Sequence, residues 1–252
     1  MTLPSVNLTM RIQICGPLVV ERRGRRLDGQ LPGRQGRLLF TYLVVHRHRP
    51  VARETLVEAL WPDRPPAGET GLNPLLSKLR RTLGADAVDG RSLLRLQLPD
   101  AWVDLEAALD AVHRAESAVA QEDWARAWGP AQVALFVAER GFLPGEDRRW
   151  ADEIREQLAD VRLRALECYT AAELGLAGPE LAGAVRASRQ LVHLAPLRET
   201  GYRHLMNALA AQGNCAEALT VYAQLRATLR EQLGISPSPE TTAVHARLLA
   251  AT

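Results

Sequence analysis

Residues 72–98, with the sequence LNPLLSKLRRTLGADAVDGRSLLRLQL, decide the fold of the first part of the chain. Leucines recur at helical spacing through residues 72–83, and Gly84 is typical of the position just past a helix C-terminus. Residues 88–98 have the pattern of a β-hairpin, with its turn at Asp89-Gly90 or directly after it. This stretch therefore predicts a helix followed at once by a hairpin.

The residues before this stretch predict short strands and two further helices. Gly16-Pro17 separates two β-forming runs, and the sequence RRGR at residues 22–25 indicates a hairpin turn. Apolar spacing predicts the helices, and Pro62 stops the second of them. These predicted elements cover residues 11–14, 18–20, 26–27, 36–46 and 53–61. Strands, three helices and a terminal hairpin together predict a winged helix-turn-helix.

After residues 99–102 the composition shifts toward Ala, Leu, Glu and Arg, and helical periodicity continues nearly throughout. Within residues 150–169, one apolar face repeats every three or four positions, which predicts a long helix. An offset of 34 residues relates Leu191 to Leu225, and also relates alanines upstream of them. That period is typical of tetratricopeptide-like helix pairs.

The fold class predicted from these patterns is α+β followed by all-α, and mainly α overall. We expect a flexible tail over residues 1–9, a winged helix-turn-helix domain over residues 10–101 and a tetratricopeptide-like helical domain over residues 102–252. Asp104 and Asp123 are the expected N-caps of the first two helices in the second domain.

The composition excludes several classes of protein. At 47% hydrophobic and 24% charged, the chain is typical of folded proteins rather than disordered ones. Its apolar stretches are too short to span a membrane and its first ten residues lack a secretory signal, so we expect a cytoplasmic protein with no membrane partner. The three cysteines are far apart and Lys78, the only lysine, follows no glycine-rich loop, so neither a metal site nor a nucleotide-binding loop is predicted. With no catalytic motif visible, we expect no enzyme and no cofactor.

The net charge of +2 conceals an asymmetry along the chain. Residues 1–103 carry sixteen Lys and Arg against nine Asp and Glu, whereas the remainder carries fifteen against twenty. A basic first part suggests a polyanionic partner such as nucleic acid. Two ordinary solvated surfaces are the alternative interpretation.

The helix predicted over residues 72–83 carries polar residues opposite its leucines. Ser77, Lys78 and Arg81 lie opposite the apolar face, with Asn73 on its flank. An α-helix fits the DNA major groove, where Arg and Lys contact guanine and Asn pairs with adenine. We therefore predict that these four residues contact bases; the alternative is an ordinary amphipathic surface helix.

A second set of arginines is predicted to contact the DNA backbone. Several of them lie near helix starts, where phosphate contacts are common, and two lie in the predicted hairpin. The set comprises Arg34, Arg37, Arg53, Arg80, Arg91 and Arg95.

Several longer motifs occur in order along the chain. They are GPL at residues 16–18, VARETLVEALW at 51–61, PPA at 65–67, LSKLRRTLG at 76–84, GFLPGEDRRW at 141–150, PLRE at 196–199, GNCAEALTVY at 213–222 and LREQLGISPSPE at 229–240. In these motifs, residues 10–252 resemble the Streptomyces antibiotic regulatory proteins, in which an OmpR-type winged helix precedes a bacterial transcriptional activation domain. The resemblance implies a transcription activator that binds direct repeats in double-stranded promoter DNA, self-associates there and contacts RNA polymerase.

Two features depart from that family's pattern. Pro74 falls where its ring would clash within a long helix, so either Asn73 caps a shortened helix with Pro74 at its first position, or the helix kinks. The sequence RSLLR at residues 91–95 replaces a wing that commonly carries Gly-Tyr. Two alternatives follow: a protein-interaction adaptor with a degenerate winged helix, and an effector-sensing regulator that uses its helical domain.

Overall fold

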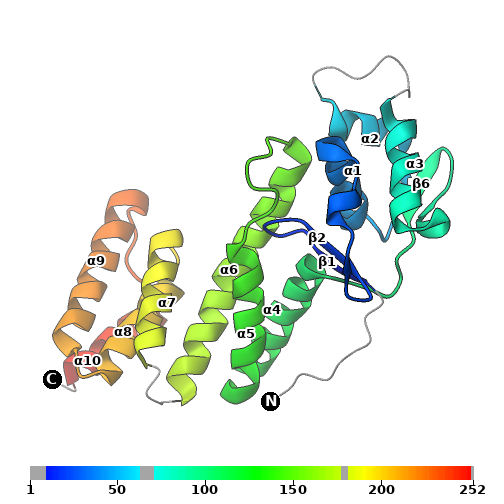
Figure 1. Ribbon diagram of the computed structural model, residues 1–252. Coiled ribbons are helices and arrows are strands. Elements are labelled where there is room, and N and C mark those ends of the chain that lie inside the picture. Colours follow the sequence, from blue (N-terminus) through cyan, green and yellow to red (C-terminus); the bar gives the residue numbers. More distant parts are fainter. Residues whose placement is uncertain (1–9, 63–70, 177–180, 251–252) are drawn as a thin grey trace. The chain divides into compact units, whose positions relative to one another are not determined.

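A computed structural model describes residues 10–62, 71–176 and 181–250, and these form two compact units (Figure 1). The N-terminal unit comprises the described residues up to Ala107 together with Arg140–Glu156. The helical unit comprises Ala108–Glu139 and the described residues from Gln157 onward. The predicted tail over residues 1–9 and the PPA motif at residues 65–67 lie outside the described residues.

The N-terminal unit opens with a small sheet whose strand order is β3-β2-β1-β7. Its strands are β1 (Met10–Gln13), β2 (Val19–Arg22), β3 (Arg25–Arg26) and β7 (Ala101–Val103). Strands β2 and β3 are antiparallel, as the predicted hairpin turn at residues 22–25 requires. Strand β1 also pairs antiparallel with β2, whereas β7 returns from far along the chain to pair parallel with β1. The sheet therefore joins the beginning and the end of the winged-helix segment.

Three helices and a second sheet complete the winged helix-turn-helix. The helices are α1 (Gly33–Val45), α2 (Arg53–Leu60) and α3 (Leu72–Leu83), and the strands are β4 (Val51–Ala52), β5 (Val88–Asp89) and β6 (Leu93–Leu96) in the order β4-β6-β5. Within the described ranges, the short 3-10 helices η1 (Asp28–Gln30) and η3 (Ala85–Ala87) connect these elements. Helix α1 packs against both α2 and α3, and their leucines form the buried core. The predicted helices and hairpin are confirmed, with α1 beginning three residues earlier than expected.

Helix α3 accommodates Pro74 without shortening. The helix begins at Leu72 with Gly71 as its N-cap, so Asn73 and Pro74 are its second and third residues. Backbone N–H groups in the first turn of a helix have no acceptor within it, and proline there removes no hydrogen bond. Of the two alternatives considered for Pro74, the one in which Asn73 caps a shortened helix is therefore wrong, because the helix keeps the range 72–83.

Residues 140–156 belong to the N-terminal unit although they lie far along the chain. The backbone N–H of Gly16 donates to Gly141 O at 2.7 Å, and Cys15 forms an antiparallel bridge with Phe142. The ring of Trp150 contacts Tyr42 and Phe142 edge-on, at centroid distances of 4.9 and 5.8 Å. This segment thus covers part of the core made by the residues before Ala107.

The carboxylate of Asp104 is the polar centre of this packing. It is fully buried, and its Oδ1 accepts the backbone N–H groups of Ile14 and Leu105 at 2.9 and 3.0 Å. Its Oδ2 accepts the Cys15 N–H at 3.1 Å and the Arg140 guanidinium at 3.0 Å. Burial raises the pKa of Asp104, and these donors partly offset that rise. Asp104 therefore does more than start a helix, since it ties the start of α4 and the segment that contains Arg140 to the residues directly after strand β1.

The helical unit is built from antiparallel helices. In the C-terminal part, α7, α8, α9 and α10 pack on one another (Figure 1). The helices are α4 (Asp104–Ala120), α5 (Trp124–Glu139), α6 (Arg149–Leu176), α7 (Leu181–Leu194), α8 (Glu199–Ala211), α9 (Cys215–Leu233) and α10 (Pro239–Ala250), and both α4 and α6 start in the N-terminal unit. No helix within the described ranges is long and apolar enough to cross a membrane.

The predicted repeat of this unit and the predicted Asp123 cap are confirmed. The prediction that Asp104 is an N-cap is wrong, because Asp104 is the first residue of α4 and its carboxylate accepts the N–H groups of Leu105 and of two residues outside the helix. Leu191 on α7 and Leu225 on α9 are both fully buried, as expected for equivalent positions 34 residues apart. Asp123 accepts the Arg126 N–H at 3.1 Å at the start of α5. Ser238 caps α10, where its Oγ accepts the Thr241 N–H at 3.4 Å.

Candidate nucleic-acid interface

Helix α3 has the two faces that its sequence predicts. Leu72, Leu76, Leu79 and Leu83 are at most 2% exposed and pack into the core. The side chains on the other face are exposed to solvent: Asn73, Ser77, Lys78 and Arg81. Because the leucines fix the rotation of the helix, these four predicted base-contacting residues share one accessible surface.

No carboxylate within the described ranges neutralises the cations of this surface. Among the residues that the structure describes, Lys78 and Arg81 form no ion pair, and the exposed Arg37 near the start of α1 forms none either. An uncompensated cation keeps its full attraction for an anion, since no carboxylate has to be displaced first. These three side chains are therefore free to contact a polyanion.

Arg80 braces the hairpin β5–β6, which is the wing of this fold. Its Nε donates to Val88 O at 3.0 Å and its Nη2 donates to Gly90 O at 3.2 Å. Gly90 has a φ of 93°, and a Cβ there would lie 1.8 Å from Leu93 O, so the tight turn requires glycine. The wing is thus fastened directly to the last turn of α3.

Arg53 braces the same region from the start of α2. Its backbone N–H donates to Ser92 O at 3.2 Å, and its Nη1 donates to Arg91 O at 3.2 Å. Its Nη2 donates to the Oδ1 of Asn73 at the beginning of α3. Together with Arg80, it lines an open groove between α3 and the wing, whose other lining residues include Asp89, Gly90 and Ser92.

The remaining predicted backbone contacts differ in their surroundings. Arg34 forms a two-pronged ion pair with Glu146 at 2.7 and 2.6 Å, and this hydrogen-bonded guanidinium lowers the pKa of the Glu146 carboxyl. Arg95 is exposed, and its Nε donates to Arg47 O at 3.3 Å. Arg91 is exposed near the tip of the wing, where its carbonyl accepts from Arg53.

Some arginines that shape the site were not predicted from the sequence. Arg22 donates to Leu83 O at 2.9 Å and so satisfies the C-terminus of α3. Arg47 donates to the carbonyls of Leu98 and Ala101 and forms an ion pair with Glu106 at 2.6 Å. These partners are 51 to 61 residues apart, and no local pattern signals contacts across such separations.

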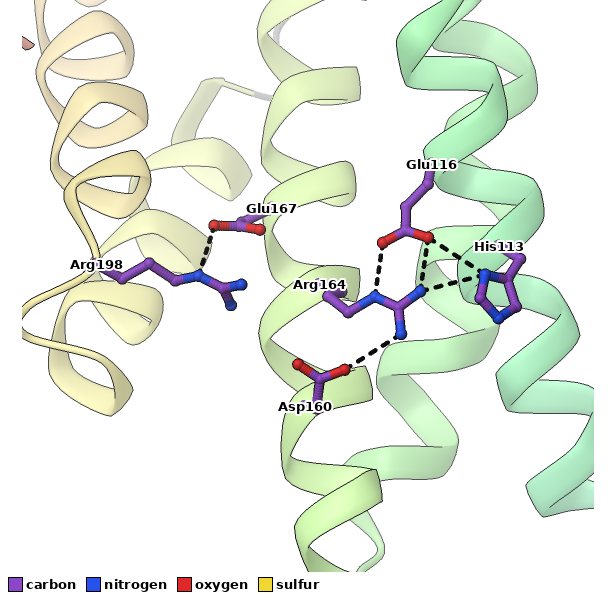
Figure 2. A network of polar contacts seen from close by, with 6 residues as sticks. All are labelled: His113, Glu116, Asp160, Arg164, Glu167 and Arg198. Carbon is purple, nitrogen blue, oxygen red and sulfur yellow. Dashed lines mark hydrogen bonds and ion pairs between the residues drawn. The ribbon is translucent and has the colours of Figure 1, made fainter. Parts of the chain in front are cut away.

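The helical unit contains a polar network of a different character. Figure 2 shows its members, which are His113, Glu116, Asp160, Arg164, Glu167 and Arg198. Arg164 on α6 donates to both carboxylate oxygens of Glu116 on α4 at 2.6 and 2.7 Å, and to Asp160 at 3.2 Å. The hydrogen bond from Arg164 lowers the pKa of Glu116. The network therefore fastens α4 to α6. As for metal binding, the described part of the chain holds no cluster of three or more potential metal ligands.

Comparisons with known proteins agree with this architecture. The family model of the bacterial transcriptional activator domain matches residues 103–249. Regulatory protein AfsR of Streptomyces griseus is 31% identical over 99% of this chain, which spans 26% of AfsR. Transcriptional regulatory protein EmbR of Mycobacterium tuberculosis (strain CDC 1551 / Oshkosh) is 26% identical over 97% of this chain, which spans 64% of EmbR. Regulatory protein DnrI of Streptomyces peucetius is 26% identical, with 91% of this chain and 88% of DnrI covered.

A solved structure supports the same fold. Mycobacterium tuberculosis EmbR in complex with a low affinity phosphopeptide superimposes with a TM-score of 0.80 at 23% identity, over 97% of this chain and 66% of that chain. All three relatives carry names of regulatory proteins rather than of enzymes. The winged helix followed by helical repeats and the match over residues 103–249 place the chain in the bacterial transcriptional activator domain family, among the Streptomyces antibiotic regulatory proteins.

Proposed function

We propose that this chain is a DNA-binding transcriptional regulator whose helix α3 enters the major groove. The observation that carries the proposal is the exposed face of α3, where Lys78 and Arg81 have no ion-pair partner within the described ranges. The buried leucines opposite leave this face as the one available for a ligand. Helices that read DNA contact base edges from such a face.

The proposed residue roles follow from exposure and partners. Asn73, Ser77, Lys78 and Arg81 contact bases, and Arg37, Arg91 and Arg95 contact the phosphate backbone. Arg34, Arg53 and Arg80 are also proposed to contact the DNA backbone. Each already donates a hydrogen bond to an oxygen of the protein, so it must either give up that acceptor or donate to it and to a phosphate at once. No catalytic group and no cofactor take part.

The helical unit supplies the second activity in this proposal. Its repeats contact RNA polymerase, so that the protein acts as an activator at promoters that contain direct repeats. Two copies associate on the DNA, each with one recognition helix. Since bacterial chromosomal DNA lies in the cytoplasm, the protein works there. The family membership and the regulatory names of the relatives support this assignment.

Salt dependence of binding tests the proposal. The full chain is used to select duplexes from a randomised double-stranded DNA library, and the affinity for the enriched duplex is then measured by fluorescence anisotropy at several salt concentrations. Neutralising 6–10 phosphates predicts a loss of roughly 10³–10⁵ in affinity between ~50 and ~200 mM salt. A weak and salt-independent response, or no enrichment, would overturn the assignment.

One observation favours a second candidate, a protein-interaction adaptor with a degenerate winged helix. Arg34, Arg53 and Arg80 all hold oxygen acceptors within the protein, which is expected of a packing module. If the chain is such an adaptor, the protein should be folded but should enrich no duplex in the selection described above. A salt-sensitive complex with one enriched sequence contradicts it.

A further inference from the structure

The orientation of the Asn73 amide is fixed by its neighbour Arg53. Asn73 is exposed at the second position of α3, and its Oδ1 accepts a hydrogen bond from Arg53 Nη2. A guanidinium has only N–H donors, so the amide atom that faces it must be the oxygen. The Nδ2 group, with its two donors, is therefore the end of the amide left for a ligand.

Arg53 itself is held from the opposite side. Its Nη1 donates to Arg91 O at 3.2 Å, and its backbone N–H donates to Ser92 O at 3.2 Å. The guanidinium thus lies between the wing and the first turn of α3. Because the wing carbonyls fix Arg53 and Arg53 fixes Asn73, the amide is oriented before DNA arrives.

An asparagine whose Oδ1 already accepts from an arginine differs in its available hydrogen-bonding groups from an asparagine that pairs with adenine. Adenine offers an N6 amino donor and an N7 acceptor, so a bidentate Asn needs both its oxygen and its amino group. Here one lone pair of the oxygen already accepts from a cation. An adenine amino group that approached the other lone pair would bring its N–H donors close to the N–H donors of the guanidinium. Guanine offers two acceptors, O6 and N7, which match the two outward donors of Nδ2.

We propose that Asn73 selects guanine over adenine, and that Arg53 acts as a positioning residue that imposes this choice. The inference rests on the proposed function and replaces the expected Asn–adenine pairing with a donor-only contact. It also gives Arg53 an internal role in place of a contact with the DNA backbone.

The test uses the duplex enriched from a randomised double-stranded library by the full chain. Each base pair of that duplex is exchanged, and affinities are compared for the unaltered protein, Asn73→Ala, Arg53→Ala and Arg53→Lys. We expect one position at which guanine is preferred to adenine by roughly 5- to 150-fold. The preference should disappear in Asn73→Ala at that position alone. Arg81→Ala serves as the matched control on the same helix, because it should lower affinity but leave the ratio at that position intact.

The Arg53 variants separate positioning from general damage. Arg53→Ala frees the amide to rotate, so the ratio of guanine to adenine affinity should fall toward one, whereas Arg53→Lys keeps a donor beside Oδ1 and should restore most of it. Thermal unfolding monitors the fold of each variant. A preference for adenine at the Asn73-dependent position, or an unchanged ratio in Arg53→Ala, overturns the inference while leaving DNA binding in place. Failure to enrich any duplex removes the proposed function and the inference together.

Discussion

The basic residues of the N-terminal unit fall into two groups with different partners. Arg34, Arg53 and Arg80 donate to oxygens inside the unit, whereas Lys78 and Arg81 form no ion pair with any residue that the structure describes. An internal acceptor competes with a phosphate or a base for the same donors. We therefore expect the second group to carry most of the sequence-dependent affinity.

The first prediction concerns that second group. Lys78→Ala and Arg81→Ala should each weaken binding to the selected duplex by about 1–3 kcal/mol, because each removes a donor to a base edge. Arg226→Ala, an exposed position on α9, is the control and should leave affinity unchanged. Competition between specific and random duplexes measures the effect; an equal loss on both would show that these residues contact phosphates instead.

The second prediction concerns Asp104. Replacing it with Ala leaves the Arg140 guanidinium and the N–H groups of Ile14 and Cys15 without this acceptor, so unfolding free energy should fall by about 3–5 kcal/mol. Asp110→Ala, on the exposed side of the same helix, should change it by less than about 0.5 kcal/mol. Urea unfolding of both variants checks the difference. Equal stabilities would mean that water replaces the carboxylate at little cost.

Among the elements, local sequence predicted most of the boundaries. Helix α3 keeps its predicted range despite Pro74, and the hairpin β5–β6 lies within the residues 88–98 predicted for it. Such signals are local, because a cap or a 3.6-residue period acts within one or two turns. The exposed face of α3 was predictable for the same reason. The hydrogen bonds that position this face, such as those from Arg80 to the wing and from Arg22 to the last residue of α3, depend on tertiary contacts and were not predictable.

The third prediction concerns the pairing of α4 with α6. Arg164 lowers the pKa of Glu116 in the folded state, so the stabilisation from this carboxylate is present above the ordinary Glu pKa and lost as pH falls through the folded value. Glu116→Gln should lower unfolding free energy by about 1 kcal/mol at neutral pH, a modest value because the side chain is 38% exposed.

Below pH ~4.3 the difference between this variant and the unaltered protein should shrink. Thermal unfolding as a function of pH measures it, with the exposed Glu231→Gln on α9 as the matched control. A difference that stays constant down to pH ~3 would show that Glu116 acts through packing rather than charge.

At the scale of the whole molecule, the compact units do not follow the order of the sequence, because the N-terminal unit combines two separate stretches of the chain. The composition shift suggested a division at residues 101 and 102, and that boundary stays a prediction. The N-terminal unit nevertheless includes Arg140–Glu156, because Phe142 and Trp150 pack there. Composition shows where a chain changes character, but it does not show which later segment returns to an earlier core.

The fourth prediction separates the two units. A fragment of residues 103–252 should show a cooperative thermal transition, since stacked helix pairs bury a core of their own. A fragment of residues 10–107 should unfold without cooperativity, and joining residues 140–156 to it through a flexible linker should restore a transition. Calorimetry of the three proteins provides the test. A stable 10–107 fragment would show that the returning segment contributes little.

The fifth prediction concerns assembly on DNA. One winged helix covers a short half-site, so affinity should depend on a second copy about one helical turn, ~10 bp, away in the same orientation. Inserting ~5 bp between the repeats places the copies on opposite faces of the duplex and should abolish cooperative binding. Footprinting distinguishes this arrangement from a palindrome, and cooperativity that survives the insertion would contradict it.

The return of Arg140–Glu156 to the N-terminal unit also sets an order of events during translation. A ribosome that has released Ala107 must still synthesise the segment through Glu156 before this unit has all its parts. At ~5–20 residues per second, that interval lasts roughly 2–10 s. During it, the nascent winged helix lacks the ring of Trp150 over Tyr42 and the guanidinium of Arg140 at Asp104. A protein made in this way completes its N-terminal unit only after helices α4 and α5 have been synthesised.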